Sequence, residues 1–184
     1  YEGRRTGGTH RGYWDYEGGG MCDMGQHHFD PEQWTYAKDY TSAVEITPFA
    51  PPSHPEVTGM WAWVELKYAD GFRFVMESTE WGPKYDQAPI RDVSMNDLSP
   101  EDQEKVKAMP DPEPLLSFGE AVKQRKKAGG HAEAAHRAAC ILHLANLAIR
   151  LGRKLNYDPD KELFVNDEEA NRFLHPPMSA PWRL

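Results

Sequence analysis

The feature that most constrains the fold is a pair of alternating segments joined by the short turn Ala69-Asp70-Gly71. Residues Met60–Tyr68 (MWAWVELKY) place Ala62, Val64 and Leu66 on one face, with the period of a half-buried strand. Residues Phe72–Glu77 (FRFVME) follow Asp70-Gly71, and an Asp-Gly pair between two such runs predicts an antiparallel hairpin. A third strand-like run precedes the hairpin, at Ala43–Phe49.

Helical patterns lie on both sides of these strands. A helix is predicted from Cys22 or Asp23 towards Tyr36, with Pro31 marking a kink or a restart. Ser99 and Asp167 are predicted to cap short helices, the latter over Glu168–Leu174, and another helix is predicted over Ser117–Lys127. The longest helix is predicted over residues 132–151, and a loop over residues 1–21. This order predicts an α+β fold: an open, mainly antiparallel sheet with helices packed on one face.

The charge balance excludes several classes of partner. Asp and Glu number 29 against 21 Lys and Arg, which gives a formal net charge of −8. An acidic chain disfavours nucleic acid and anionic membrane surfaces, and no apolar run approaches the roughly 18 residues of a membrane span. Two cysteines are too few for a disulfide framework. The sequence therefore predicts no nucleic-acid partner and no membrane.

The densest polar cluster is the run GGGMCDMGQHHFD, residues 18–30. On one helix, Asp23 and His27 would share a face, and a carboxylate beside an imidazole suits proton transfer near neutral pH. The alternative is structural, with Asp23 capping the helix and His27 packed in a polar network. No zinc-type spacing occurs, so no metal site is predicted.

Three further residues are candidates for substrate contact. Trp14 and Tyr16 flank the cluster and could stack on a sugar ring or simply belong to the core. His136 stands near the start of the longest predicted helix, with His143 two turns further on. Packing of that helix is the alternative role for both histidines. The basic residues near 123–127 are interpreted as a solvated helix end.

Dinucleotide-binding elements are absent from the sequence. The glycine run Gly18–Gly20 lacks the third glycine of G-x-G-x-x-G and follows no strand, and no Walker-type motif occurs. No cofactor-binding residue is therefore predicted.

The sequence resembles a known family over nearly its whole length. The run from Gly18 to Asp30 resembles the D-x-G-x-H segment of the Gfo/Idh/MocA oxidoreductases, placed on Asp23, Gly25 and His27. The stretch Ala50–Trp81 and the ending His136–Leu184 are similar to the bacterial subgroup with a distinctive C-terminal domain.

This resemblance implies a single domain, residues 1–184, that binds a sugar or cyclitol and forms homo-oligomers through its sheet face. The catalytic pair would be Asp23 and His27. NAD or NADP would be bound mainly by a missing N-terminal Rossmann domain, whose Glu-Lys-Pro lysine is also absent here. The chain alone is therefore expected to be inactive, and an enzyme only within a longer protein.

Two other functions stay open at this stage. One is a lyase or glycosidase that acts through a transient keto-sugar, and the other is a non-catalytic sugar-binding or assembly module. The opening Tyr1 and the absence of a signal pattern suggest a fragment. The expected compartment is the cytoplasm, with export through an upstream twin-arginine signal as the alternative.

Overall fold

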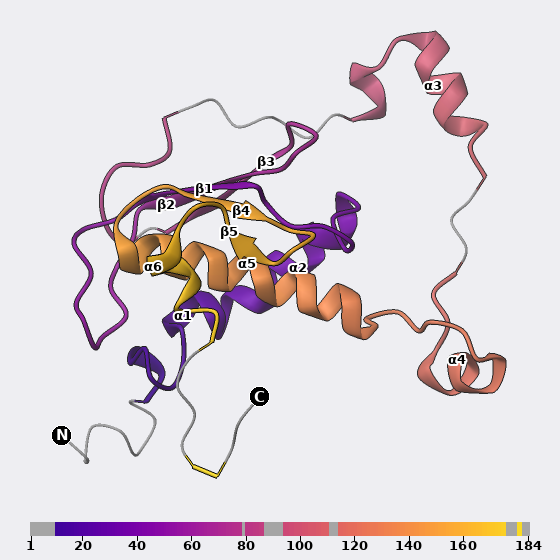
Figure 1. Ribbon diagram of the computed structural model, residues 1–184. Coiled ribbons are helices and arrows are strands. Elements are labelled where there is room, and N and C mark those ends of the chain that lie inside the picture. The colour runs from indigo at the N-terminus through magenta and orange to yellow at the C-terminus, as the bar shows by residue number, and fades with distance from the viewer. Residues whose placement is uncertain (1–9, 79, 87–93, 111–113, 176–179, 182–184) are drawn as a thin grey trace. The chain divides into compact units, whose positions relative to one another are not determined.

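The computed structural model describes residues 10–78, 80–86, 94–110, 114–175 and 180–181 (Figure 1). The chain divides into two compact units. The first takes in Tyr1–Tyr85 and Ala132–Leu184, and the second is Asp86–His131.

The first unit is built on a five-stranded antiparallel sheet in the order β3-β2-β1-β4-β5. Together with the helices packed on it, this sheet confirms the predicted α+β class. Its strands are β1 (Glu45–Phe49), β2 (Trp63–Lys67), β3 (Arg73–Glu77), β4 (Leu155–Asp158) and β5 (Leu163–Phe164). The last two strands were not predicted, because four and two residues are too short to show a period of two.

The hairpin of β2 and β3 confirms the prediction from its alternating pattern. Its register runs from Trp63 opposite Glu77 to Lys67 opposite Arg73. Gly71 adopts a φ of 88° in the turn, a conformation that other residues rarely take. Val64 and Leu66 are fully buried, so one face of the hairpin belongs to the core, as expected.

The core lies between the sheet and the helix α5 (Ala132–Leu151), whose bounds match the prediction. Figure 1 shows α5 lying along one face of the sheet with α2 beside it. Ala145 and Ala148 have no exposed surface, and these small side chains let the helix backbone approach the sheet closely. Ile141 and Ile149 fill the space on either side of them.

The helix predicted from Cys22 or Asp23 towards Tyr36 is present as α2 (Gly25–Thr35), which begins two to three residues later than predicted. A separate short helix, α1 (Gly19–Cys22), precedes it, with a break at Asp23, whose ψ of −85° leaves the helical range. Pro31 lies inside α2 and does not end it. The predicted loop is also partly helical, because η2 (His10–Gly12) and α1 fall within it; residues 1–9 lie outside the described part of the chain.

The N-terminal bound of the predicted last helix is confirmed. α6 (Glu168–Asn171) begins after Asp167, whose side chain accepts a hydrogen bond from the Ala170 backbone N–H. The helix ends at Asn171, three residues before the predicted Leu174, because the Asn171 side chain turns to pair with Phe164 of β5.

Charged pairs and aromatic rings cover the open face of the sheet. Glu45 of β1 bridges Lys67 of β2 and Lys154 next to β4. At the other end of β1, Phe49 stacks on Trp63 with ring centroids 5.3 Å apart. This face therefore combines cross-strand ion pairs with an aromatic cluster.

Acid should weaken the bridge made by Glu45. The lysines Lys154 and Lys67 lower the pKa of this carboxyl from 4.5 to about 2. A folded-state pKa below the unfolded value means that the bridge stabilises the fold above about pH 4.5, and that this contribution is lost as pH falls towards 2. Glu45→Gln should lower the free energy of unfolding by less than about 1 kcal/mol at pH 7, because the pair is partly solvated. Urea titrations of both proteins should converge by pH 2; a constant difference would contradict this.

The second unit contains η3 (Met95–Asp97), which was not predicted, and the two predicted helices α3 (Pro100–Lys107) and α4 (Phe118–Gln124). Ser99 accepts a hydrogen bond from the Asp102 backbone N–H, which confirms the predicted cap, and Ser117 caps α4 in the same way.

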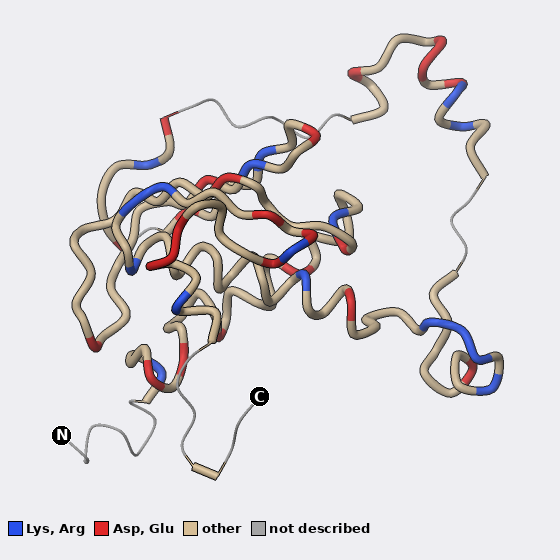
Figure 2. Tube along the Cα trace, in the orientation of Figure 1, with Lys and Arg blue, Asp and Glu red and all other residues tan. Residues whose placement is uncertain are grey.

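The predicted end of the second helix at Lys127 is wrong, because Arg125 takes a left-handed conformation that ends α4 at Gln124. The basic residues at 123 and 125–127 follow one another at the end of α4 and just after it (Figure 2). All four are exposed, which confirms their interpretation as a solvated helix end.

Candidate functional site

The glycine-rich segment forms a tight junction between α1 and α2. A Cβ atom at Gly25 would lie 3.2 Å from the Phe29 ring, which is a tight contact, and 3.6 Å from the Gly20 carbonyl oxygen, which is an ordinary one. Gly18 is packed still more tightly, because an added Cβ would lie 2.3 Å from Asn146 Nδ2 and 2.4 Å from Cys22 Sγ. The junction is therefore held against the middle of α5.

A cavity of about 540 Å³ opens beside this junction. Its walls come from four segments that are far apart in the sequence. They are Gly18–Met21, Met24 with the α2 residues 25, 28 and 29, the loop Thr58–Trp61, and residues 77, 78 and 80 at the end of β3 and just after it, with Asn146 of α5 completing the lining. The volume matches a small organic ligand, and both apolar and polar side chains face it.

Asp23 does not share a helical face with His27, which corrects the geometry predicted for the pair. Asp23 closes α1, its backbone N–H donating to the Gly19 carbonyl, and α2 begins only at Gly25. The Asp23 carboxylate instead forms an ion pair with Arg11 of η2. Arg11 therefore neutralises the charge of Asp23. The sequence pattern gave no sign that these two residues would be in contact.

His27 is exposed on the first turn of α2. Its imidazole makes no hydrogen bond, ion pair or ring contact with any described residue. The structural alternative, Asp23 capping this helix and His27 packed in a polar network, is thus also wrong, since Met24 occupies the N-cap. The neighbouring His28 lines the cavity, whereas Asp23 and His27 lie outside its lining. A helix turns about 100° per residue, so His27 lies on the adjacent face.

Asn146 is a site residue that sequence reasoning missed. Its Nδ2 donates to the Gly18 carbonyl oxygen at 2.8 Å and to Cys22 Sγ at 3.0 Å, while the residue is 8% exposed. The available signal was a polar amide within the apolar run LHLANLAI. Cys22 also approaches His143 Nδ1 at 4.0 Å. Burial raises the pKa of the Cys22 thiol and lowers that of His143, so both groups favour their neutral forms.

The structure does not bring the predicted substrate-contact residues together. Trp14 donates its Nε1–H to the His54 carbonyl oxygen, and its ring packs against the Arg150 guanidinium, 5.2 Å from ring centroid to Cζ. Tyr16 is 51% exposed. His136 lies 14 residues before Arg150 on α5, about 21 Å along the helix axis. None of the three residues lines the cavity.

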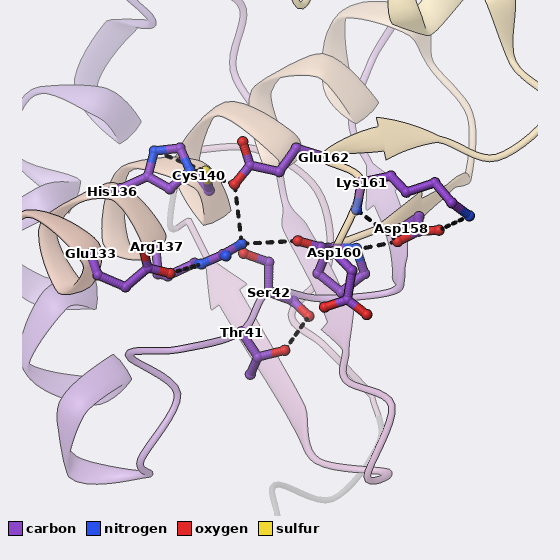
Figure 3. A network of polar contacts seen from close by, with 11 residues as sticks. Thr41, Ser42, Glu133, His136, Arg137, Cys140, Asp158, Asp160, Lys161 and Glu162 are labelled. Carbon is purple, nitrogen blue, oxygen red and sulfur yellow. Dashed lines mark hydrogen bonds and ion pairs between the residues drawn. The ribbon is translucent and has the colours of Figure 1, made fainter.

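His136 belongs instead to a polar network at the start of α5 (Figure 3). Its Nε2 lies 2.7 Å from Glu162 Oε1, and Arg137 joins the same carboxylate at 3.4 Å. Arg137 also donates to Glu133 on its own helix and to the Pro159 carbonyl oxygen. These contacts connect the start of α5 to the turn between β4 and β5, so in this structure His136 helps to hold the fold together.

Within the described residues, no three His, Cys, Asp or Glu side chains converge as a metal site would need. No helix there is long and apolar enough to cross a membrane. The sheet is antiparallel and the glycine segment leads into a helix of only four residues, so the described residues do not fit a dinucleotide site.

Comparison with known proteins identifies the family. Residues 1–184 match the family described as the oxidoreductase family, C-terminal alpha/beta domain, of the Gfo/Idh/MocA group. No curated protein and no solved structure matches the chain significantly. The family match over the whole chain agrees with the antiparallel sheet and its helical layer. The chain therefore belongs to the Gfo/Idh/MocA oxidoreductases, as a C-terminal domain of that family.

Proposed function

We propose that this chain is the substrate-binding part of an NAD(P)-dependent oxidoreductase that acts on a hydroxyl group of a sugar or cyclitol. The observation that carries the proposal is the exposed, unpartnered imidazole of His27, one residue from the cavity-lining His28. An imidazole kept free at the surface beside a cavity of ligand size is available for proton transfer.

His27 would exchange the proton of the reacting hydroxyl. An imidazole can accept or donate a proton, so it can serve both directions of transfer. Asp23 would position the substrate. Its carboxylate lies just before α2, is held by an ion pair with Arg11, and would accept a hydrogen bond from a second hydroxyl of the substrate. Both roles follow the D-x-G-x-H pattern of the family and remain proposals for this chain.

NAD(P), when bound, supplies the hydride acceptor or donor. Because the described residues do not form a dinucleotide site, the proposal places that group on a further domain of the intact protein, and the 184-residue chain should not turn over alone. Hydride transfer needs the substrate and the cofactor held in contact, and this chain provides one side of that arrangement.

We further propose that copies of the intact protein associate through the open face of the sheet. The support is the aromatic cluster around Phe49 and Trp63, since Phe49 is 40% exposed and Trp81 packs on it. The proposed compartment is the cytoplasm.

Product analysis tests the proposed reaction. The intact protein should be incubated with NAD+ or NADP+ and a panel of sugars, cyclitols and glycosides. The proposal predicts net reduced nicotinamide in equal amount to a keto product. Release of an aglycone or an unsaturated sugar without net reduced nicotinamide would contradict it and would indicate a lyase or glycosidase acting through a transient keto-sugar.

A further inference from the structure

The most deeply buried polar side chain among the described residues that line the cavity belongs to Asn146. It lies on α5, is 8% exposed, and borders the cavity beside the glycine segment. The other polar lining residues are half-buried or exposed, so bulk water can satisfy them. A polar group as buried as Asn146 is costly unless each of its hydrogen-bonding atoms has a partner.

The amide nitrogen of Asn146 has its partners inside the protein. Nδ2 carries two hydrogens, and it donates to the Gly18 carbonyl oxygen at 2.8 Å and to Cys22 Sγ at 3.0 Å. These contacts also fix the orientation of the amide, because the reverse orientation would set Oδ1 against the Gly18 carbonyl oxygen, acceptor against acceptor. The side chain is therefore held in one orientation before any ligand binds.

The carbonyl oxygen of Asn146 has no such partner. Oδ1 accepts no hydrogen bond from the described residues. It also differs from Gln33 Nε2 and Ser42 Oγ, which are enclosed in the protein without a partner among the described residues. Since Asn146 lines the cavity, Oδ1 is open on the cavity side. The cavity wall thus offers a fixed acceptor that only water or a ligand can satisfy.

The contacts of Asn146 favour an uncharged donor for this acceptor. Gly18 contributes a peptide carbonyl, and Cys22 contributes a thiol that stays protonated because burial raises its pKa. No full charge in contact with Asn146 could therefore compensate a buried cation. A hydroxyl group supplies an O–H donor without a charge. A ligand that covered Oδ1 without donating to it would leave a buried acceptor unpaired, at a cost in affinity.

We infer that Asn146 is a substrate-binding residue whose Oδ1 accepts a hydrogen bond from one ring hydroxyl of the sugar or cyclitol. Asn146 would thereby select compounds that carry a hydroxyl at that ring position over analogues that lack the donor. The inference rests on the proposed function, because it names a specificity determinant of the same site.

Calorimetry on the intact protein tests the inference with neutral ligands that differ in one group. The parent compound is whichever of D-glucose and myo-inositol binds more tightly, and the analogues are its monofluoro derivatives. Fluorine is close to a hydroxyl in size but cannot donate a hydrogen bond. At one ring position, the analogue should bind about tenfold more weakly than the parent compound, the loss expected for one hydrogen bond to a buried acceptor.

Two variants separate the acceptor from the structural contacts of Asn146. Asn146→Leu and Asn146→Asp both lose the Nδ2 donor to Gly18 and Cys22, but Asn146→Asp keeps an acceptor oxygen. The loss at that ring position should therefore disappear in Asn146→Leu and persist in Asn146→Asp, whereas a purely structural role would affect all ligands alike. The control Asn171→Leu removes structural bonds to Phe164 outside the cavity and should keep the parent protein's ligand profile.

The measurement on the unmodified protein requires no variant to fold, and equal binding of the parent compound and all its analogues there would overturn the inference. So would a loss that persists at every position in Asn146→Leu, or no binding of either parent compound. A position-specific loss that depends on Asn146, in a protein that yields no reduced nicotinamide, would support the inference and contradict the proposed function. Turnover of sugars or cyclitols without such a loss would do the opposite.

Discussion

Replacing His27 with alanine in the intact protein should lower kcat by about 10² to 10⁴-fold. The side chain is exposed, makes no contact with the described residues, and lies beside a cavity of ligand size. Its removal therefore costs little in folding but deletes the group that would exchange the hydroxyl proton, and losses of this size are typical of a general acid–base.

His175→Ala is the matched control for this variant. His175 is also an exposed histidine, and it lies outside the cavity lining and the polar network around His136. Its variant should keep the kcat of the parent protein, and both variants should unfold at the parent's urea midpoint. An unchanged kcat in His27→Ala would remove His27 from the mechanism.

Replacing Gly18 with alanine should lower the free energy of unfolding by about 2–4 kcal/mol. The new Cβ would lie 2.3 Å from Asn146 Nδ2 and 2.4 Å from Cys22 Sγ, so α1 or Asn146 must move. Movement of Asn146 also breaks its hydrogen bond to the Gly18 carbonyl oxygen in a buried position. The estimate combines overpacking with the loss of that bond.

The same glycine run provides the control. An added Cβ at Gly20 meets nothing within 4 Å, and Gly20 does not have a positive φ. Gly20→Ala should therefore leave stability unchanged or raise it by up to about 1 kcal/mol, through the unfolded chain. Guanidinium titrations of both variants test this prediction, and Gly18→Ala should unfold at a lower guanidinium concentration than Gly20→Ala. Equal midpoints would mean that Asn146 does not hold this junction.

The sequence predicted those helices and strands whose formation depends mainly on residues close together in the chain. Helix α5 was bounded correctly because its apolar residues recur over five turns and glycines stand near both ends. The hairpin was clear from strict alternation around Asp70-Gly71. The short β4 and β5 depend on pairing with β1 and with each other, which a single strand cannot reveal in its own pattern.

The candidate site was only partly predictable for a similar reason. Helical spacing placed Asp23 and His27 on one face, but the ion pair of Asp23 with Arg11, 12 residues away, accompanies a break between them. The residues that line the cavity are spread along the sequence between Gly18 and Asn146. Only the folded chain therefore shows that His28 and Asn146 line the same cavity. The family could be inferred from the sequence resemblance, whereas the residues that line the cavity could be found only from the structure.

The central claim is that this chain provides the substrate side of a dehydrogenase and needs a dinucleotide-binding domain to act. The most direct test compares the 184-residue chain with a protein that contains it together with such a domain, using NAD(P)H formation on the sugar and cyclitol panel. The account predicts turnover by the longer protein and none by the chain, although the chain should still bind the ligand. Turnover by the chain alone, or none by the longer protein with any of these compounds, would contradict it.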